Sequence, residues 1–221
     1  DYYIYPKRIS VSELNFENDS EKELLISSIL CNDGMITDGE QIGDPTETAL
    51  LAVLREKKYI EYSFSDVREA CPRLSEIPFD SDRKMMSTEN KCDGRYVIYV
   101  KGAVDVLLKR ITHIRKYGSE KPELINEEDR LYIEKQNLEF SREGLRVLAF
   151  AYKELDAEKE LTLEDENNLV FSGLIAMMDP PRQESKQAVE ECIKAGIRPV
   201  MITGDHKVTA AAIAKRIGII K

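Results

Sequence analysis

Residues 78–87 read Pro-Phe-Asp-Ser-Asp-Arg-Lys-Met-Met-Ser, and the strands predicted on either side of this stretch fix the fold. An apolar run over residues 74–79 ends in Asp-Ser-Asp, which is typical of a turn. Two cations, Arg83 and Lys84, follow before a second extended run begins. Phe79 therefore lies at the mouth of a loop. Taken alone, the stretch also fits a core residue at a strand end followed by a solvated pair of cations.

A hairpin is predicted directly after this stretch, because Asp93-Gly94 strongly favours a two-residue turn. Residues 95–101 read Arg-Tyr-Val-Ile-Tyr-Val-Lys, which is typical of a strand. A tight turn would pair Met86 with Lys101, so that Lys84 shares a face of the hairpin with Lys101. A longer loop would shift this register but keep both lysines near one hairpin end. Two like charges repel there unless an anion lies between them, and a nearby aromatic face suits a purine with a phosphate tail.

The composition excludes several classes of protein. The 221 residues are 42% hydrophobic and 33% charged, with a net charge of −9, which fits a soluble domain and argues against a nucleic-acid partner. No apolar run approaches the roughly 18–20 residues needed to cross a bilayer. No signal peptide is seen, and the chain starts at Asp1 without a methionine, so we expect an excised piece of a longer protein. The four cysteines form no C-x-x-C pair and suit reduced thiols in the cytosol, and the two distant histidines argue against a zinc site.

Capping residues and hydrophobic periodicity predict the order of the elements. A Ser20–Glu23 capping box begins the first helix, and an acid, a proline and a glutamate begin the second at Asp44. Further helices are predicted over 65–71, 103–111, from Asn126 to Gly144, 184–194 and 206–217. The strands are predicted over 74–79, on both sides of the hairpin at 84–101, and over 145–152, 169–178 and 197–203. Residues 113–123 and 155–168 are predicted to be loops.

A boundary is predicted at Asp179-Pro180-Pro181, because neither proline has an N–H with which to continue a helix or strand. Beyond it, the order of elements is typical of a parallel, doubly wound sheet. Asp179 and Thr203-Gly204-Asp205 then fall at the carboxyl ends of strands, where such sheets bind ligands. Two strands cannot form this sheet alone, so the tail is expected to be part of a domain.

Five motifs together resemble the nucleotide-binding domain of the P-type ion-transporting ATPases, in that family's order. They are Gly43-Asp44-Pro45-Thr46-Glu47, the stretch 79–87, Lys101-Gly102-Ala103, Asp179-Pro180-Pro181-Arg182 and Thr203-Gly204-Asp205. The resemblance implies an α+β nucleotide-binding domain over residues 1–178, with a mainly antiparallel twisted sheet flanked by helices. Residues 179–221 would be an incomplete segment of the phosphorylation domain, with a haloacid-dehalogenase-like parallel sheet.

The resemblance also implies roles for single residues. Phe79 would stack on adenine, Glu47 would lie beside the adenine amino group, and Lys101 and Gly102 would line the bottom of the pocket. Lys84 and Arg146 would approach the phosphates. In the complete enzyme Thr203, Gly204 and Asp205 would meet the γ-phosphoryl group and Mg²⁺, while Asp179, Pro180, Pro181 and Arg182 would form a hinge. The sequence leaves bland alternatives open: Glu47 as a capping residue, Lys101 as a solvated strand end, and Arg146 in a structural ion pair.

What the sequence lacks limits the expected activity. The family's phosphorylated Asp-Lys-Thr-Gly-Thr motif is missing, so the fragment should bind ATP, with no metal site of its own, but neither hydrolyse ATP nor transport ions. Without a glycine-rich phosphate loop, and with Ser81 where some calcium pumps carry arginine, the affinity should be modest.

The parent protein would be a membrane ATPase, with this domain at the cytoplasmic face and the other domains of the same polypeptide as its partners. The motifs look most like those of bacterial calcium pumps. The alternatives are a non-catalytic module that binds a protein or another anion, and a haloacid-dehalogenase-type phosphatase, which would need an Asp-x-Asp nucleophile.

Overall fold

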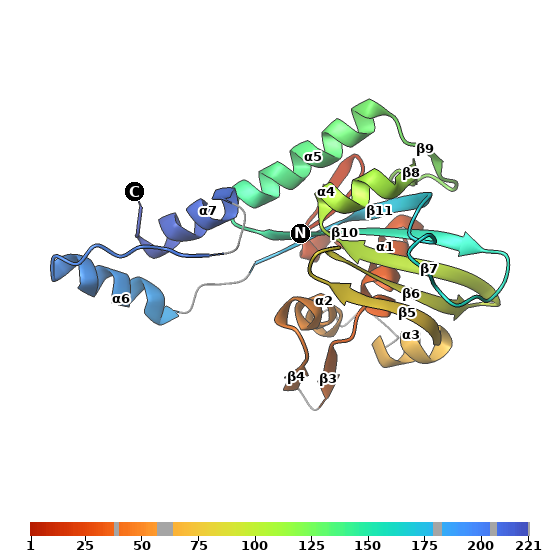
Figure 1. The fold of residues 1–221 in the computed structure, drawn as a ribbon, viewed down its shortest axis with the longest axis horizontal. Helices are drawn as coiled ribbons and strands as arrows, with labels where there is room; N and C mark the ends of the chain where they lie inside the picture. The colour runs from red at the N-terminus through yellow and green to blue at the C-terminus, as the bar shows by residue number, and fades with distance from the viewer. Residues whose placement is uncertain (38–39, 57–63, 179–182, 204–206, 221) are drawn as a thin grey trace.

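A mainly antiparallel sheet with helices on both faces forms the body of the molecule (Figure 1). The structure is a computed structural model, and it describes residues 1–37, 40–56, 64–178, 183–203 and 207–220. The strands of the main sheet follow the order β2-β1-β11-β10-β7-β6-β5, with β8 parallel to β11 and β9 beside β8. Their bounds are β1 Tyr2–Ile4, β2 Lys7–Ile9, β5 Arg73–Asp80, β6 Met85–Cys92, β7 Arg95–Gly102, β8 Ile111–Ile114, β9 Glu123–Leu124, β10 Arg146–Leu155 and β11 Leu169–Met177.

The predicted hairpin is confirmed, including its register. β6 and β7 pair with Cys92 opposite Arg95 and Met86 opposite Lys101. Asp93 and Gly94 both take positive φ angles, 50° and 78°, as a tight two-residue turn requires. The local turn chemistry therefore fixed the pairing of two strands correctly.

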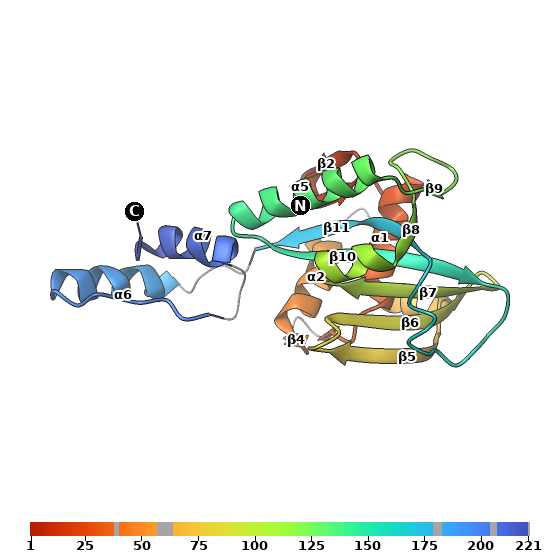
Figure 2. The same ribbon diagram turned by 45° about the horizontal axis from the view of Figure 1, so that its top comes forward.

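Helices cover the two faces of the sheet (Figure 2). Along β10, Ala149 and Ala151 join a core that includes α4 and α5, whereas Phe150 joins the core beneath α1 and α2. This alternation follows from the period of two in a strand. The helices are α1 Asp19–Leu30, α2 Pro45–Glu56, α3 Phe64–Ala70, α4 Val104–Leu107, α5 Glu127–Arg142, α6 Gln183–Lys194 and α7 Lys207–Ile217, with the 3₁₀ turns η1 Val11–Glu13 and η2 Leu108–Arg110. A separate hairpin pairs β3, Met35–Thr37, with β4, Glu40–Ile42.

Helix ends were predicted with mixed success. Asn126 caps α5 in a capping box with Asp129, and Gly144 follows the helix with φ 78°, as expected. The predicted Ser20–Glu23 capping box is wrong: the Asn18 side chain accepts the backbone N–H groups of Ser20 and Glu21 instead. Asn18 lies two residues earlier and satisfies two N–H groups of the first turn, so the helix begins at Asp19.

One predicted loop and the state of the cysteines also differ from expectation. The stretch 113–123 was predicted to be a loop, but its first two residues, His113 and Ile114, belong to β8, which pairs with β11. The four cysteines are not all reduced, because Cys71 and Cys92 form a disulfide, while Cys31 and Cys192 are free. Cys71 precedes β5 and Cys92 ends β6, and the pairing of these two strands brings the cysteines together. The two cysteines are 21 residues apart in the sequence, so no local pattern indicated that they pair.

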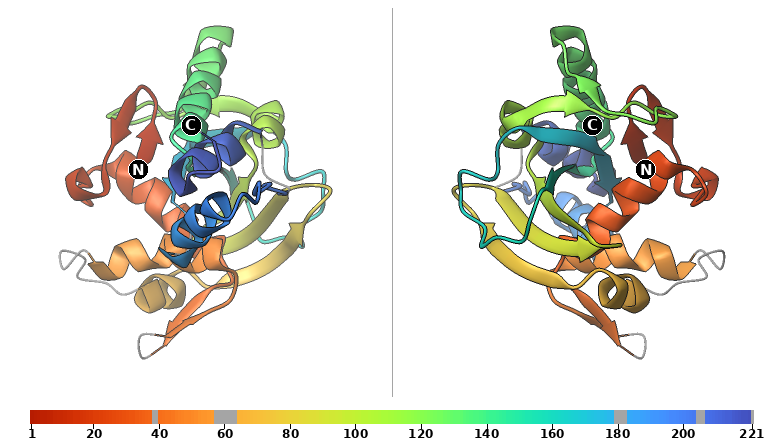
Figure 3. Two further views of the ribbon diagram at one scale, coloured as in Figure 1. Left: turned by 90° about the vertical axis from the view of Figure 1, so that its left-hand side faces the viewer. Right: turned by 90° about the vertical axis from the view of Figure 1, so that its right-hand side faces the viewer.

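The C-terminal segment forms α6 and α7, which extend away from the sheet (Figure 1) and lie in front of it when the molecule is viewed from that end (Figure 3, left). The predicted strand over 197–203 is not formed, and Ile202 is 95% exposed. The prediction needed the strand at 169–178 as a parallel neighbour, but β11 lies inside the antiparallel sheet, between β1 and β10. A parallel strand without a hydrogen-bonded neighbour has no partners for its backbone groups. The described residues therefore show the antiparallel part of the predicted fold and no parallel sheet in this segment.

Candidate nucleotide pocket

A cavity of about 640 Å³ opens at one end of the sheet, where β5 and β7 end, β10 begins and α2 starts. It is lined by five of the six residues predicted to contact ATP: Glu47, Phe79, Lys84, Lys101 and Arg146. The sixth, Gly102, lies in the backbone between Lys101 and Ala103, both of which line the cavity. We call this cavity the β5–β7 pocket. Its volume lies in the range of small-molecule sites.

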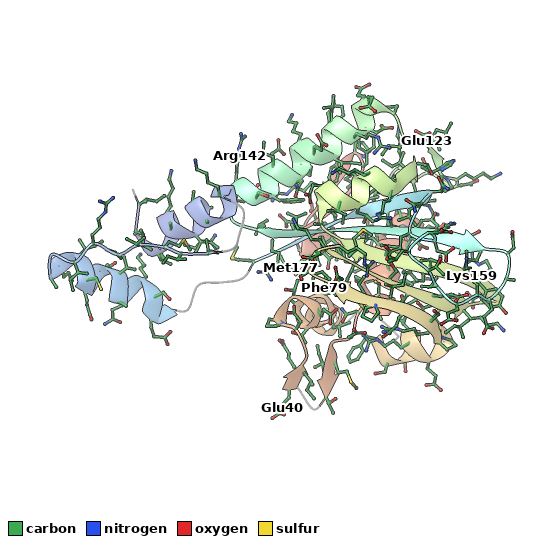
Figure 4. The ribbon with its side chains drawn as sticks, viewed as in Figure 1. Glu40, Phe79, Glu123, Arg142, Lys159 and Met177 are labelled. Atoms are coloured by element: carbon green, nitrogen blue, oxygen red, sulfur yellow. A yellow bond between two sulfur atoms is a disulfide. The ribbon has the colours of Figure 1, made fainter. Side chains whose placement is uncertain are left out.

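Phe79 stands at the mouth of this pocket rather than in the core. Its side chain is 61% exposed at the end of β5 (Figure 4). A large aromatic ring exposed to water gains nothing from burial in this state. The alternative of a strand-end core residue is therefore wrong. The exposed ring at a cavity mouth is placed to stack on a flat ligand.

Lys101 forms an ion pair with Glu47 inside the pocket. The side chain of Lys101 is 6% exposed and that of Glu47 is 15% exposed, and the Lys101 ammonium donates to Oε1 of Glu47. Oε2 of Glu47 accepts the backbone N–H of Asp33 at 3.2 Å. Asp44 caps α2 itself, because its Oδ1 accepts the N–H of Thr46 at 2.7 Å. Glu47 thus faces Lys101 rather than the helix end, and Lys101 is not a solvated strand end.

The turn between β5 and β6 directs Lys84 to the same pocket. Lys84 has φ 54°, its N–H donates to the carbonyl of Asp80 at 2.6 Å, and its own carbonyl accepts the N–H of Ala103 at 3.0 Å. Lys84 therefore lies in the turn and not in β6. The prediction that it shares a strand face with Lys101 is wrong, because a residue in a turn does not follow the alternation of a strand. Both lysines still line one cavity, because the Lys84 carbonyl bonds to the N–H of Ala103 and so holds the turn against the end of β7.

Gly102 permits this fold-back. A Cβ atom at Gly102 would lie 2.6 Å from Cγ of Met85 and 2.8 Å from the carbonyl oxygen of Lys84. The glycine is thus required by the chain's own close approach. Its predicted role in admitting a ligand stays a prediction.

Arg146 is the first residue of β10 and donates to the Thr46 hydroxyl at 2.7 Å, across the entrance of the pocket. Burial alone would raise the pKa of Asp44, but hydrogen bonds from Thr46 and the charge of Arg146 outweigh it and lower that pKa. The start of α2 and the start of β10 are therefore joined by a polar network with an ionised carboxylate at neutral pH.

Sequence reasoning missed one buried pair beside the pocket. The Arg83 guanidinium donates to the fully buried carboxylate of Glu166, which also accepts the Ser87 hydroxyl. Arg83 is only 12% exposed, so the interpretation of Arg83 and Lys84 as a solvated pair is wrong for Arg83. Glu166 belongs to a charged stretch without periodicity, and no local pattern pointed to its burial.

The two predicted motifs that follow β11, at 179–182 and 203–205, contribute no described residue to the lining of the pocket. Thr203 lies in the irregular segment before α7. Gly204 and Asp205, and the predicted hinge residues Asp179, Pro180, Pro181 and Arg182, lie outside the described residues. Within the described ranges, no group of three or more His, Cys, Asp or Glu side chains could hold a metal ion. In the same ranges no helix combines the length and apolarity needed to cross a membrane.

Comparison with known proteins gives consistent matches. Residues 20–184 match the family described as "P-type ATPase, cytoplasmic domain N". The chain is 47% identical over 213 residues to "Calcium-transporting ATPase 1" of Bacillus cereus, covering 95% of the chain and 23% of that protein. It is 48% identical over 201 residues to the protein of the same name from Lactococcus lactis, covering 90% and 22%. A "Calcium-transporting ATPase 1" of Saccharomyces cerevisiae is 36% identical over 210 residues, covering 93% and 22%. The chain thus spans less than a quarter of the length of these relatives.

Proposed function

This chain belongs to the family of P-type ATPase cytoplasmic N domains, and on that premise we propose that it binds ATP in the β5–β7 pocket. The observation that carries the proposal is an aromatic ring, 61% exposed, at the mouth of a cavity whose interior holds a buried lysine. A purine needs a flat apolar face, and a polyphosphate needs cations. The pocket offers both from residues that are far apart in the chain.

Each lining residue has a role in this proposal. The adenine stacks on Phe79, which contributes through dispersion and exclusion of water. Lys84 and Arg146, which both line the pocket, meet the phosphates as cations. Lys101 and Glu47 form the floor, where the carboxylate accepts the exocyclic amino group of adenine and the ammonium stays paired. Gly102 holds the floor and the Lys84 turn together.

The proposal extends to the longer protein that this chain matches in part. We propose that the parent couples ATP hydrolysis to cation transport, with Ca²⁺ as the cation because the matched relatives carry that name. Residues 1–178 would present ATP from the cytoplasmic side of a membrane. Residues 179–221 would belong to a haloacid-dehalogenase-like phosphorylation domain completed elsewhere in the polypeptide. There, Mg²⁺ would neutralise phosphate charge, with Thr203, Gly204 and Asp205 nearby and Asp179, Pro180, Pro181 and Arg182 as the hinge.

Calorimetric titration of ATP into the wild-type chain and Phe79→Ala tests the proposal. We expect saturable one-site binding, weakened in the variant by about 1–3 kcal/mol, which is about 5- to 150-fold in Kd. Leu124→Ala is the matched control, because Leu124 is also an exposed apolar side chain, 72% exposed, on β9 away from the pocket. It should bind ATP as the wild type does.

A wild-type chain that is folded by circular dichroism but fails to bind millimolar ATP would contradict the pocket assignment. The lysines would then serve a protein partner or another anion. Proposals about the parent are tested separately, by ATP-dependent ⁴⁵Ca²⁺ uptake into vesicles that contain the longer protein. Uptake of another cation but not of Ca²⁺ would refute the calcium assignment alone.

A further inference from the structure

We propose that Arg83 and Glu166 are positioning residues for nucleotide binding: they hold the Phe79–Lys84 turn in the shape that aims Phe79 and Lys84 at the β5–β7 pocket. This inference rests on the proposed function. Neither residue is among those that line the pocket, so neither is assigned a contact with the ligand.

The turn has little packing of its own to hold it. Residues 79–82 are all exposed, and Phe79, which lines the pocket, is 61% exposed. Inside the turn, Oδ1 of Asp80 accepts the N–H groups of Asp82, at 3.1 Å, and Arg83, at 2.7 Å. These bonds shape the turn locally, but they do not attach it to the rest of the domain.

Arg83 attaches the turn through its side chain, in addition to the backbone bond between the Lys84 carbonyl and the N–H of Ala103. One arm of its guanidinium donates to the carboxylate of Glu166, and the other donates to the carbonyl of Pro78 at 2.6 Å. Pro78 directly precedes Phe79, and Lys84 directly follows Arg83. A planar guanidinium can hold two acceptors in a fixed geometry, which a lysine ammonium cannot reproduce. The Arg83 side chain therefore restrains the backbone next to both Phe79 and Lys84.

Glu166 is a firm anchor for this clamp. It is fully buried and belongs to the segment 156–168, which connects β10 to β11 in the sequence and contacts β5 and β6. The same Oε1 atom accepts the Ser87 hydroxyl from β6, and the Glu166 carbonyl accepts Arg110 at 3.4 Å. The segment is fastened further by the N–H of Leu161, which donates to the hydroxyl of Ser75 at 3.0 Å. The clamp thus ties the turn to a covering segment 83 residues away.

The test removes the pair without leaving a buried charge. In the double variant Arg83→Met/Glu166→Leu both charged groups become apolar and similar in size. We expect Kd for ATP to rise about tenfold, as it does when the binding-competent conformation falls to about a tenth of the population. The matched control is Lys159→Met, which breaks an ion pair of the same segment with Asp165 but does not touch the turn. Lys159 lies toward the far end of the sheet from Phe79 (Figure 4).

A second readout follows the turn itself. The chain contains no tryptophan, so Phe79→Trp supplies a single tryptophan at the pocket mouth, which excitation at the red edge of the absorption band selects over the ten tyrosines. Without nucleotide, we expect its fluorescence anisotropy to fall when the Arg83–Glu166 pair is replaced and to stay unchanged with Lys159→Met. A pair that only stabilises the fold would lower the melting temperature without this difference. Arg83→Lys, which keeps the charge but loses the two-acceptor fork, should lie between wild type and the double variant in both readouts.

Wild-type Kd in the folded double variant, or unchanged anisotropy at residue 79, would overturn the proposal. If the double variant does not fold, wild-type Kd and anisotropy in Arg83→Lys would overturn it in the same way. If the wild-type chain itself does not bind ATP, the proposed function fails, and the anisotropy comparison still decides whether the pair holds the turn.

Discussion

Replacing Lys101 with methionine should destabilise the protein because it leaves Glu47 in the pocket without its cation. Breaking a fully buried ion pair by removing one partner costs about 3–5 kcal/mol, whereas exposed pairs contribute about 0–1 kcal/mol. The side chains here are 6% and 15% exposed, which places the pair near the buried limit. Two features reduce the cost: the pair lines a cavity that water can enter, and Asp33 still donates to the remaining carboxylate. We therefore expect a loss of about 2 kcal/mol in the free energy of unfolding.

The assay is urea unfolding followed by circular dichroism, with the midpoint and the slope fitted separately. A loss of this size lowers the midpoint without changing the slope, because the surface exposed on unfolding is the same. It also lowers the melting temperature by about 4–8 °C in a chain of this length. The double variant Glu47→Gln/Lys101→Met removes the uncompensated charge, so it should recover more than half of the lost stability.

Two results would refute this reasoning. If Lys101→Met unfolds at the wild-type urea midpoint, the ammonium contributes nothing at its position on the pocket floor. If the double variant is less stable than Lys101→Met alone, an uncompensated carboxylate is not the cause of the loss. A control at an exposed pair, Arg95→Met, should change stability by less than about 1 kcal/mol, because Arg95 and Glu154 are 64% and 59% exposed.

Three other perturbations have defined outcomes. Gly102→Ala should cost about 1–3 kcal/mol in urea unfolding through overpacking, and should also weaken ATP binding; wild-type values for both would show that the chain tolerates a Cβ there. Burial raises the pKa of the Cys31 thiol to about 11, so at pH 8 iodoacetamide should modify Cys192 in the native protein and reach Cys31 only after unfolding, as peptide mass mapping can check. Burial alone would raise the pKa of Asp165, but hydrogen bonds from Lys159 and Thr162 lower it overall. The ionised Asp165 carboxylate therefore stabilises the folded state fully above its ordinary pKa of 3.8, and this stabilisation is lost as the pH falls through the lower pKa of the folded state. Asp165→Asn should therefore flatten the acid side of the curve of stability against pH, and an unchanged slope would count against this assignment.

Local patterns were sufficient for the hairpin and for most helices. Asp93-Gly94 fixed the register of β6 and β7, and that register placed Lys101 at the end where the pocket opens. Proline and acidic residues correctly began α2, and glycines with positive φ followed α5, α6 and α7. These features depend on residues within a few positions of each other, which is why a sequence without an alignment reveals them.

Contacts between residues far apart in the chain could not be predicted from the sequence. Lys101 meets a carboxylate 54 residues earlier, and Arg83 meets one 83 residues later, in a stretch with no periodicity. Burial of a charged group can be predicted only once its partner is placed, so nothing in the predicted loop 155–168 indicated that Glu166 is buried. The strand expected over 197–203 is absent for a related reason: its presumed neighbour, β11, pairs on its two sides with β1 and β10.

The pairing of β1 with β11 has a practical consequence. The N–H of Ala176 donates to the carbonyl of Asp1 at 2.8 Å, and the Asp1 ammonium donates to the carbonyl of Ala176 at 2.9 Å. Asp1 and the end of β11 thus lie side by side, so the two ends of the stretch 1–177 are adjacent in space. A unit with adjacent ends can be grafted into a surface loop of a host protein with little strain on either partner. Placed within a fluorescent protein, it would make a compact module whose nucleotide response reaches the host through two neighbouring strands.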